Sequence, residues 1–169
     1  MEKMLEKKIV LLRGGAGCGK STFIASVGLK QYVLSPDDIR LEIAKPELMP
    51  DGTYQIPQNN HIVLDILFDR LESRMQKDEF IVIDATNSSR VEMSSYKDRA
   101  DIYGYQVLMV DMTDVPIDVC KAQNAARMPE YKRVPEWVID KMYQRFETEI
   151  IPDGITVVKP DQLLATLGA

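Results

Sequence analysis

The sequence predicts a three-layer α/β domain with a parallel sheet of about five strands, and two observations support this fold class. Short apolar runs alternate with amphipathic stretches along the chain, as they do in a series of β-α-β units. The run Gly14–Ser21 reads G-x-x-x-x-G-K-S and lies between the apolar residues 9–12 and the sequence Thr-Phe-Ile-Ala at 22–25. A strand, a glycine-rich turn and a helix in this order form a phosphate-binding loop.

The strands are expected at five apolar runs, residues 9–12, 31–35, 80–84, 106–110 and 155–158. The helices are expected where apolar residues recur with helical spacing, at residues 20–27, 37–44, 58–77, 89–103, 116–127, 135–149 and 162–167. Three prolines and Asp51-Gly52 predict a loop at 45–57, and a polar loop is expected at 128–134. Ligands of parallel sheets lie beyond the carboxyl ends of the strands, so we expect the functional site there.

The composition is that of an ordinary globular protein. With 169 residues, 45% of them hydrophobic, the chain has the size of one domain spanning 1–169. No apolar run approaches the length of a membrane span, and the charged residues 1–8 do not resemble a signal peptide. Cys18 and Cys120 are the only cysteines, which favours a reducing, cytoplasmic location. The net charge of −5 argues against extensive coating of nucleic acid but is compatible with a local basic groove.

The phosphate-binding loop predicts a site for a nucleoside triphosphate. Glycines let the backbone turn through positive φ and approach a ligand, and amides at the start of a helix favour an anion. Lys20 can reach the β and γ phosphates, and the Ser21 hydroxyl can ligate Mg²⁺. The alternative, a glycine-rich hairpin with an isolated lysine, does not account for the flanking strand and helix. We therefore expect ATP or another nucleoside triphosphate to contact the loop residues Gly15, Ala16, Gly17, Cys18, Gly19, Lys20, Ser21 and Thr22.

A second group of polar residues, Ser35-Pro36-Asp37-Asp38-Ile39-Arg40, follows the second predicted strand. A kinase that phosphorylates a hydroxyl needs a carboxylate to accept the hydroxyl proton, and Asp37 or Asp38 could do this. Arg40 lies three residues after Asp37 on the same helix face, where its fork of donors suits an acceptor phosphate. The alternative is simple helix capping, with Arg40 as a surface charge. The preceding phosphate-binding loop favours the catalytic interpretation.

A third motif begins with an apolar strand that ends in an aspartate. Phe80–Asp84 has this pattern and is followed by Ala85-Thr86-Asn87. Such an aspartate is typical of the second carboxylate of phosphate-loop enzymes, which holds Mg²⁺ or orients its ligands. The alternative is an Asx turn that closes the strand. We expect Asp84 to act with Ser21 at the metal.

A basic, proline-interrupted loop joins two predicted helices and contains Arg127, Lys132 and Arg133. Such a loop could close over the triphosphate as part of a helical lid, and it could supply an arginine that stabilises charge in the transition state. Arg127, at a helix end, is the first candidate for this role and for nucleotide binding, and Arg133 is the second. The alternative is a solvated basic turn.

Together these motifs resemble the 5′-hydroxyl polynucleotide kinase family, of the phage T4 type and of the kinase module of bacterial end-healing enzymes. The resemblance covers about residues 9–142, with the motifs in the right order and at compatible spacing. The motifs are Gly14-x4-Gly19-Lys20-Ser21-Thr22, Ser35-x-Asp37-Asp38-x-Arg40, Asp84-Ala85-Thr86-Asn87, and Asn124-x-x-Arg127 with Val134-Pro135. The first motif is shared by many enzymes, whereas the second and third narrow the choice. The resemblance implies a P-loop kinase fold with a helical lid.

The resemblance also implies roles for individual residues. Lys20 and Ser21 would bind the phosphates and the metal. Asp37 would be the general base on the 5′-hydroxyl, and Arg40 would contact the phosphate on the 3′ side of the acceptor. Asp84 would help to place the lid arginine or the metal ligands.

Arg127 would be that lid arginine, on the ATP phosphates. The sequence departs from the family in one respect, because it has Gln123-Asn124 where the family often has Arg-Asn. Either Arg133 or Lys132 could replace the missing arginine. No Asp-x-Asp-Gly-Thr phosphatase motif is present, so the phosphatase activity of the T4 type is not expected from this sequence.

We therefore expect transfer of the ATP γ-phosphate, with Mg²⁺, to the 5′-hydroxyl end of RNA or DNA. The alternative is a kinase of a small hydroxyl compound such as a nucleoside, sugar or antibiotic, since a fold alone does not identify the acceptor. A nucleotide-dependent switch is less favoured, because the sequence has no Asn-Lys-x-Asp motif and no Asp-x-x-Gly motif after the loop. The sequence does not distinguish RNA from DNA as the acceptor, or ATP from GTP as the donor. It is also compatible with a homo-oligomer and with a covalent or separate phosphatase or ligase partner.

Overall fold

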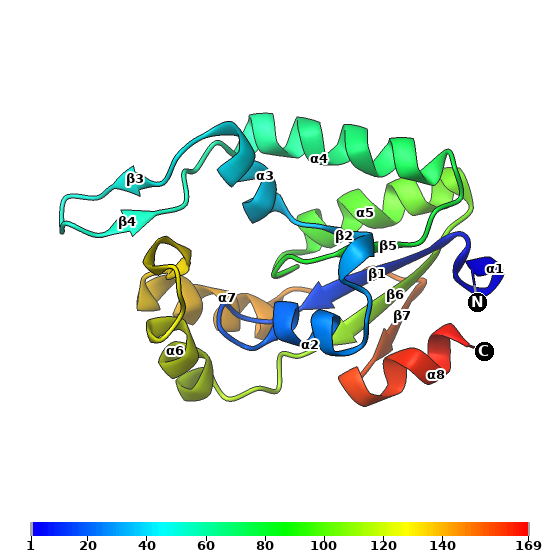
Figure 1. Ribbon diagram of the computed structural model, residues 1–169. Coiled ribbons are helices and arrows are strands. Elements are labelled where there is room, and N and C mark those ends of the chain that lie inside the picture. Colours follow the sequence, from blue (N-terminus) through cyan, green and yellow to red (C-terminus); the bar gives the residue numbers. More distant parts are fainter. Residues whose placement is uncertain (1, 169) are drawn as a thin grey trace.

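A parallel five-stranded sheet forms the centre of the computed structural model, which describes residues 2–168 (Figure 1). The strand order is β2-β5-β1-β6-β7, so the first long strand lies in the middle. The strands are β1 (Lys8–Arg13), β2 (Val33–Leu34), β5 (Ile81–Ile83), β6 (Gln106–Asp111) and β7 (Ile155–Val158). Every pairing within this sheet is parallel. The predicted three-layer α/β fold with about five parallel strands is confirmed.

Helices cover both faces of the sheet (Figure 1). The first layer is made of α3 (Pro36–Ile43), α4 (Asn60–Met75) and α5 (Arg90–Tyr103). The second is made of α2 (Lys20–Ser26), α6 (Ile117–Ala125), α7 (Glu136–Thr148) and α8 (Leu163–Leu167). Short elements complete the chain: α1 (Glu2–Leu5) and the 3₁₀ turns η1 (Lys30–Tyr32), η2 (Glu130–Lys132) and η3 (Pro160–Gln162).

The apolar core is divided by the sheet into two clusters. Successive side chains of β1 alternate between them: Ile9 and Leu11 pack with the first helical layer, whereas Val10 and Leu12 pack with the second. All four are fully buried. A central parallel strand buries both faces, which explains why it appears in the sequence as a continuous apolar run.

The largest difference from expectation is a β-hairpin within residues 45–57, where a loop is predicted. Its strands are β3 (Glu47–Leu48) and β4 (Tyr54–Gln55), which pair antiparallel with Leu48 opposite Tyr54. The turn that joins them is closed by the Met49 amide, which donates to the Thr53 carbonyl at 2.8 Å. The turn itself agrees with the Asp51-Gly52 signal, but strands this short leave no periodicity to detect.

The other expected elements are present with altered boundaries. The strand expected at 31–35 is shortened to β2 because η1 occupies its start, and the strand expected at 80–84 ends before Asp84. The N-terminal segment forms α1 before the first strand. Within residues 2–168, none of the helices combines the length and the apolar character needed to cross a membrane.

The two-sided core predicts a clear difference between two leucines of α4. Leu67 is fully buried, whereas Leu64 is 40% exposed. We expect Leu67→Ala to lower the free energy of unfolding by about 2–5 kcal/mol, because it removes buried methyl groups and leaves a cavity. Leu64→Ala is the matched control and should lower the free energy of unfolding by clearly less. Urea denaturation monitored by circular dichroism measures both, and equal losses would contradict the assigned packing.

Candidate functional site

One cleft of about 1930 Å³ is lined by most of the site residues predicted from the sequence. It lies at the carboxyl ends of the strands, where the phosphate-binding loop leaves β1 and α3 begins after β2. The predicted residues that line it are Ala16, Gly17, Cys18, Gly19, Lys20, Ser21, Thr22, Asp37, Arg40, Asp84 and Arg127. Motifs from four separate segments are therefore brought to one surface. Gly15 and Arg133 are not among the lining residues.

The phosphate-binding loop has the backbone conformation that its glycines suggested. Gly17 and Gly19 have φ values of 83° and 95°, in the left-handed region that side chains disfavour. Lys20 is folded back over the loop, and its ammonium donates to the carbonyls of Gly14 and Gly15 at 3.0 and 2.9 Å. These hydrogen bonds hold the lysine against the backbone concavity in which phosphates would lie.

The loop is also closely packed at Gly14, Gly15 and Gly17, where an added Cβ would lie less than 3.0 Å from a neighbouring atom. A Cβ added to Gly15 would lie 2.9 Å from the ring of Tyr143, and one added to Gly17 would lie 2.3 Å from the Cys120 carbonyl oxygen. Gly15 therefore has a packing role against α7, outside the cleft surface. Cys18 contributes its backbone to the turn, since its amide donates to the Gly15 carbonyl at 3.1 Å. Burial raises the pKa of the Cys18 thiol, and nearby Lys20 opposes this change.

Ser21 and Asp84 meet directly at the edge of the cleft. The Ser21 hydroxyl donates to Asp84 Oδ2 at 2.6 Å, because β1 and β5 are neighbours and the segments after them leave the same edge of the sheet. Two hard oxygen donors side by side suit Mg²⁺, which commonly takes one or two protein ligands and completes its shell with water and phosphate oxygens. Within residues 2–168, no three Asp, Glu, His or Cys side chains are grouped to bind a metal by themselves.

The residues after Asp84 anchor the phosphate-binding loop to the neighbouring strand. The Gly14 amide donates to the Thr86 carbonyl at 3.2 Å, and the fully buried Asn87 donates from Nδ2 to the Leu12 carbonyl at 2.6 Å. In the other direction, Arg13 donates from Nε to the Asn87 carbonyl at 3.1 Å. Asn87 has a φ of 46°, a conformation that asparagine tolerates better than most residues. The Asp84–Asn87 motif thus has a structural part and a part that faces the cleft.

The carboxylate and the arginine of the second motif form one hydrogen-bonded unit. Arg40 Nη1 donates to Asp37 Oδ1 at 2.7 Å, and Nη2 donates to the side-chain oxygen of Asn60 at 2.6 Å. The Arg40 side chain is only 16% exposed, whereas Asp37 is 55% exposed. Helix capping, the alternative considered for this motif, is also present: the Ser35 hydroxyl accepts from the Asp38 amide at 3.3 Å. Capping therefore leaves Asp37 and Arg40 available to the cleft.

Asp38 lines the same cleft in a different electrostatic environment. Partial burial raises its pKa above the ordinary value, and the neighbouring carboxylates of Asp84 and Asp37 add to this rise. Lys132, from the loop across the cleft, acts in the opposite direction. Asp38 thus lies within electrostatic reach of both Asp84 and Lys132.

The basic loop after α6 is closed by a buried asparagine. Asn124 donates from Nδ2 to the Val134 carbonyl at 2.8 Å, and its Oδ1 accepts from the Val134 amide at 3.0 Å. Arg127 and Lys132 line the cleft. Arg133 instead donates from Nε to the Arg127 carbonyl at 2.9 Å and bonds within the loop. Of the two candidates to replace the missing lid arginine, Lys132 is the one that lines the cleft.

The cleft lining also includes polar residues that were not found from the sequence, among them Lys30, Asn60, Glu92, Lys141 and Arg145. Burial raises the pKa of Glu92, whose carboxylate accepts from the Asn87 amide at 3.1 Å. Ser89, with Glu92 three residues later, has the spacing of a capping box, and that signal could have marked Glu92. Asn60, Lys141 and Arg145 carry no comparable local signal.

The cleft is cationic even though the chain is acidic. Its basic lining residues are Lys20, Lys30, Arg40, Arg127, Lys132, Lys141 and Arg145, and its acidic ones are Asp37, Asp38, Asp84 and Glu92. The whole chain has a net charge of −5. Concentrating positive charge in a concave surface focuses the field and attracts anionic ligands.

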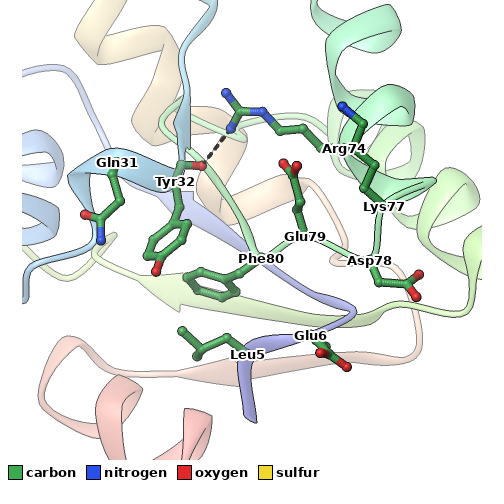
Figure 2. Close-up of a pocket in the computed structure, with 9 residues that line it drawn as sticks. All are labelled: Leu5, Glu6, Gln31, Tyr32, Arg74, Lys77, Asp78, Glu79 and Phe80. Atoms are coloured by element: carbon green, nitrogen blue, oxygen red, sulfur yellow. Dashed lines mark hydrogen bonds between the residues drawn. The ribbon is translucent and has the colours of Figure 1, made fainter. Parts of the chain in front are cut away.

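A second cavity, of about 450 Å³, lies at the opposite end of the sheet. Figure 2 shows its residues, which precede β1, β2 and β5 or belong to the end of α4. Tyr32 and Phe80 pack edge to face with centroids 5.1 Å apart, and Arg74 donates to the Tyr32 carbonyl at 3.2 Å. None of the site residues predicted from the sequence lines this cavity.

The fold is shared with solved structures at low sequence identity. A chain of the "Pnkp1/Rnl/Hen1 RNA repair complex" is 20% identical, with a TM-score of 0.67 over 84% of this chain and 44% of that chain. A chain of the AvrRxo1-ORF1:-ORF2 complex with ATP is 21% identical, with a TM-score of 0.61 over 85% and 48%. A gluconokinase from Sinorhizobium meliloti 1021 is 18% identical, with a TM-score of 0.57 over 96% and 87%.

This chain matches only about half the length of the first two of these proteins. Similarity at such identities establishes the fold, which is that of a P-loop kinase, and not the acceptor. No curated protein sequence matches the chain. The sequence profile of one family, described as "AAA domain", matches residues 9–148 and so includes every motif that lines the cleft. The chain belongs to this AAA domain family.

Proposed function

We propose that the protein transfers the γ-phosphoryl group of ATP to the 5′-hydroxyl end of RNA or DNA. The observation that carries this proposal is the Asp37–Arg40–Asn60 unit, which lines the same cleft as the phosphate-binding loop. A carboxylate joined to an arginine offers a proton acceptor and a phosphate-binding fork at one point. Such a pair suits an acceptor that presents a hydroxyl near a phosphate.

The proposed reaction is an in-line displacement at the γ-phosphorus. Asp37 accepts the proton of the acceptor hydroxyl, whose oxygen forms the new bond to phosphorus while the bond to the β–γ bridging oxygen breaks and ADP leaves. Lys20 and the loop amides hold the phosphates, and Arg127 stabilises the charge that spreads over the transferred group. Ser21 and Asp84 would hold Mg²⁺, and the bound ion would neutralise part of the phosphate charge.

The cationic cleft favours an acceptor that carries phosphate. Lys20 and Arg127 can serve the triphosphate, while Arg40, which lies on α3 near Asp37, can serve the acceptor. Because end-on binding neutralises only a few phosphates, it is compatible with an acidic protein. The similarity in fold to the chain of an RNA repair complex is consistent with this acceptor.

A kinase of a small hydroxyl compound is the second candidate. The observation in its favour is the match to a gluconokinase over 96% of this chain and 87% of that chain. The match to the RNA repair chain includes less than half of that chain. We propose that residues 1–169 act as one kinase domain. For the nucleic-acid kinase, we also propose a phosphatase or ligase partner, either covalently joined or separate.

A transfer assay separates the two candidates. We expect γ-labelled ATP to phosphorylate 5′-hydroxyl RNA, 5′-hydroxyl DNA or nucleoside 3′-monophosphates, and chelation of Mg²⁺ to abolish the transfer. Label transfer to gluconate, nucleosides or aminoglycosides, with none to the three nucleic-acid acceptors, would establish the second candidate instead.

The role of Asp37 predicts a selective loss of turnover. General-base catalysis contributes about 10²- to 10⁴-fold, so we expect Asp37→Asn to lower kcat by a factor in this range. Binding of ATP, measured by calorimetry, should stay close to that of the parent protein. Asp38→Asn is the matched control, because Asp38 is also a carboxylate in the first turn of α3 and differs from Asp37 mainly in its surroundings. A larger effect of Asp38→Asn would transfer the role of the base to Asp38.

The role of Arg40 predicts a loss of acceptor preference. Hydrogen bonds to charged groups are worth about 1.5–3 kcal/mol, so we expect Arg40→Ala to raise the KM for a nucleoside 3′-monophosphate about 10- to 100-fold. The KM for a nucleoside that lacks this phosphate should change much less. Arg40→Lys should restore little, because an ammonium cannot bridge Asp37, Asn60 and a phosphate as the guanidinium fork does. Steady-state kinetics with both acceptors is the test.

A further inference from the structure

The cleft-facing side of α7 carries two cations for which the proposed function has no role. Residues Val138, Lys141, Met142 and Arg145 line the cleft at spacings of three and four residues, which places them on one helix face. The adjacent side of α7 is used for packing, since Ile139 is fully buried and Tyr143 lies against the phosphate-binding loop. The orientation of α7, and with it the direction of both cations, is therefore set by the core.

Charge is segregated along this helix. The acidic residues of α7, which are Glu136, Asp140 and Glu147, do not line the cleft. Asp140 forms an ion pair with Lys121 at 2.7 Å on the outer surface. Within residues 2–168, neither Lys141 nor Arg145 takes part in an ion pair. Two cations that face a cleft without partners are available to an anionic ligand.

Arg145 and Arg40 line the same cleft, and both lie near the buried carboxylate of Glu92. Burial raises the pKa of this carboxylate, and the nearby cations Arg145, Arg40 and Lys20 act in the opposite direction. Arg145 and Arg40, which belong to different helices, thus lie within electrostatic reach of the same group. Lys141 is one helical turn from Arg145, about 6 Å along the axis at 1.5 Å per residue. Both side chains line the same cleft as Arg40.

We propose that Lys141 and Arg145 form a second phosphate subsite, which binds an internucleotide phosphodiester of the acceptor strand beyond the phosphate at Arg40. This inference rests on the proposed function and deepens it. The enzyme then selects a strand over a mononucleotide. Exposed lysine and arginine side chains bind the strand backbone without reading its bases, so the selection is for length and not for sequence.

The test compares acceptors of two lengths in Lys141→Gln/Arg145→Gln. We expect the KM for a 5′-hydroxyl tetranucleotide with a 3′-phosphate to rise about tenfold or more, because the charge-assisted hydrogen bonds to phosphate are removed. The KM values for a nucleoside 3′-monophosphate and for ATP should change less than about twofold, since neither reaches the subsite. The slope of log(kcat/KM) for the tetranucleotide against log[salt] should fall by about 0.7 for each phosphate that the variant no longer neutralises.

The matched control is Lys77→Gln/Lys121→Gln, which removes the same charge outside the cleft. Lys77 lies at the second cavity, and Lys121 forms a half-buried ion pair with Asp140 outside the cleft. The control should leave all three KM values unchanged. Thermal unfolding and tetranucleotide binding by fluorescence anisotropy, measured with the single variants as well, separate loss of the subsite from loss of the fold.

Each outcome has a distinct meaning. If the parent protein phosphorylates neither acceptor, the proposed function fails. If it phosphorylates both and the cleft variant loses activity on both equally, or loses ATP affinity instead, only the subsite is overturned. An equal effect of the control variant would assign the change to net charge and would also overturn the subsite.

Discussion

The side-by-side pairing of β1 and β5 is the constraint from which the donor half of the cleft follows. Leu11 pairs with Ile83, so both strands end at the same edge of the sheet. One is followed by the phosphate-binding loop and the other by Asp84, and the Ser21–Asp84 hydrogen bond at 2.6 Å results from this register. Asn87 reinforces the junction because its side chain donates to the Leu12 carbonyl and its backbone carbonyl accepts from Arg13. The core and the site therefore share one set of backbone positions.

The sequence was sufficient for the features that depend on local patterns. Apolar runs located the strands because a central parallel strand is buried on both faces, and the glycine-rich motif located the phosphate-binding loop because its backbone needs positive φ at Gly17 and Gly19. Asp37, Arg40 and Asp84 could be singled out because each follows a strand end. All three line the cleft.

Other features depend on tertiary packing and have no local signature. Lys141 and Arg145 belong to an ordinary amphipathic helix, and only the burial of Ile139 decides which of its sides faces the cleft. The role of Asn124 depends on Val134, ten residues away across an irregular loop. Arg133 illustrates the converse: its charge and position suggested nucleotide binding, but it bonds to the loop backbone and lies outside the cleft lining.

The close packing of Gly17 against α6 excludes a side chain at this position. A Cβ on Gly17 would lie 2.3 Å from the Cys120 carbonyl oxygen and 2.8 Å from the Asn124 amide nitrogen, so any substitution would push α6 away from the phosphate-binding loop. The bonds from Asn124 to Val134 hold both ends of the intervening segment together. The segment between these bonds carries Arg127 and Lys132, so the buried side chain of Asn124 also helps to hold two cations of the cleft in position.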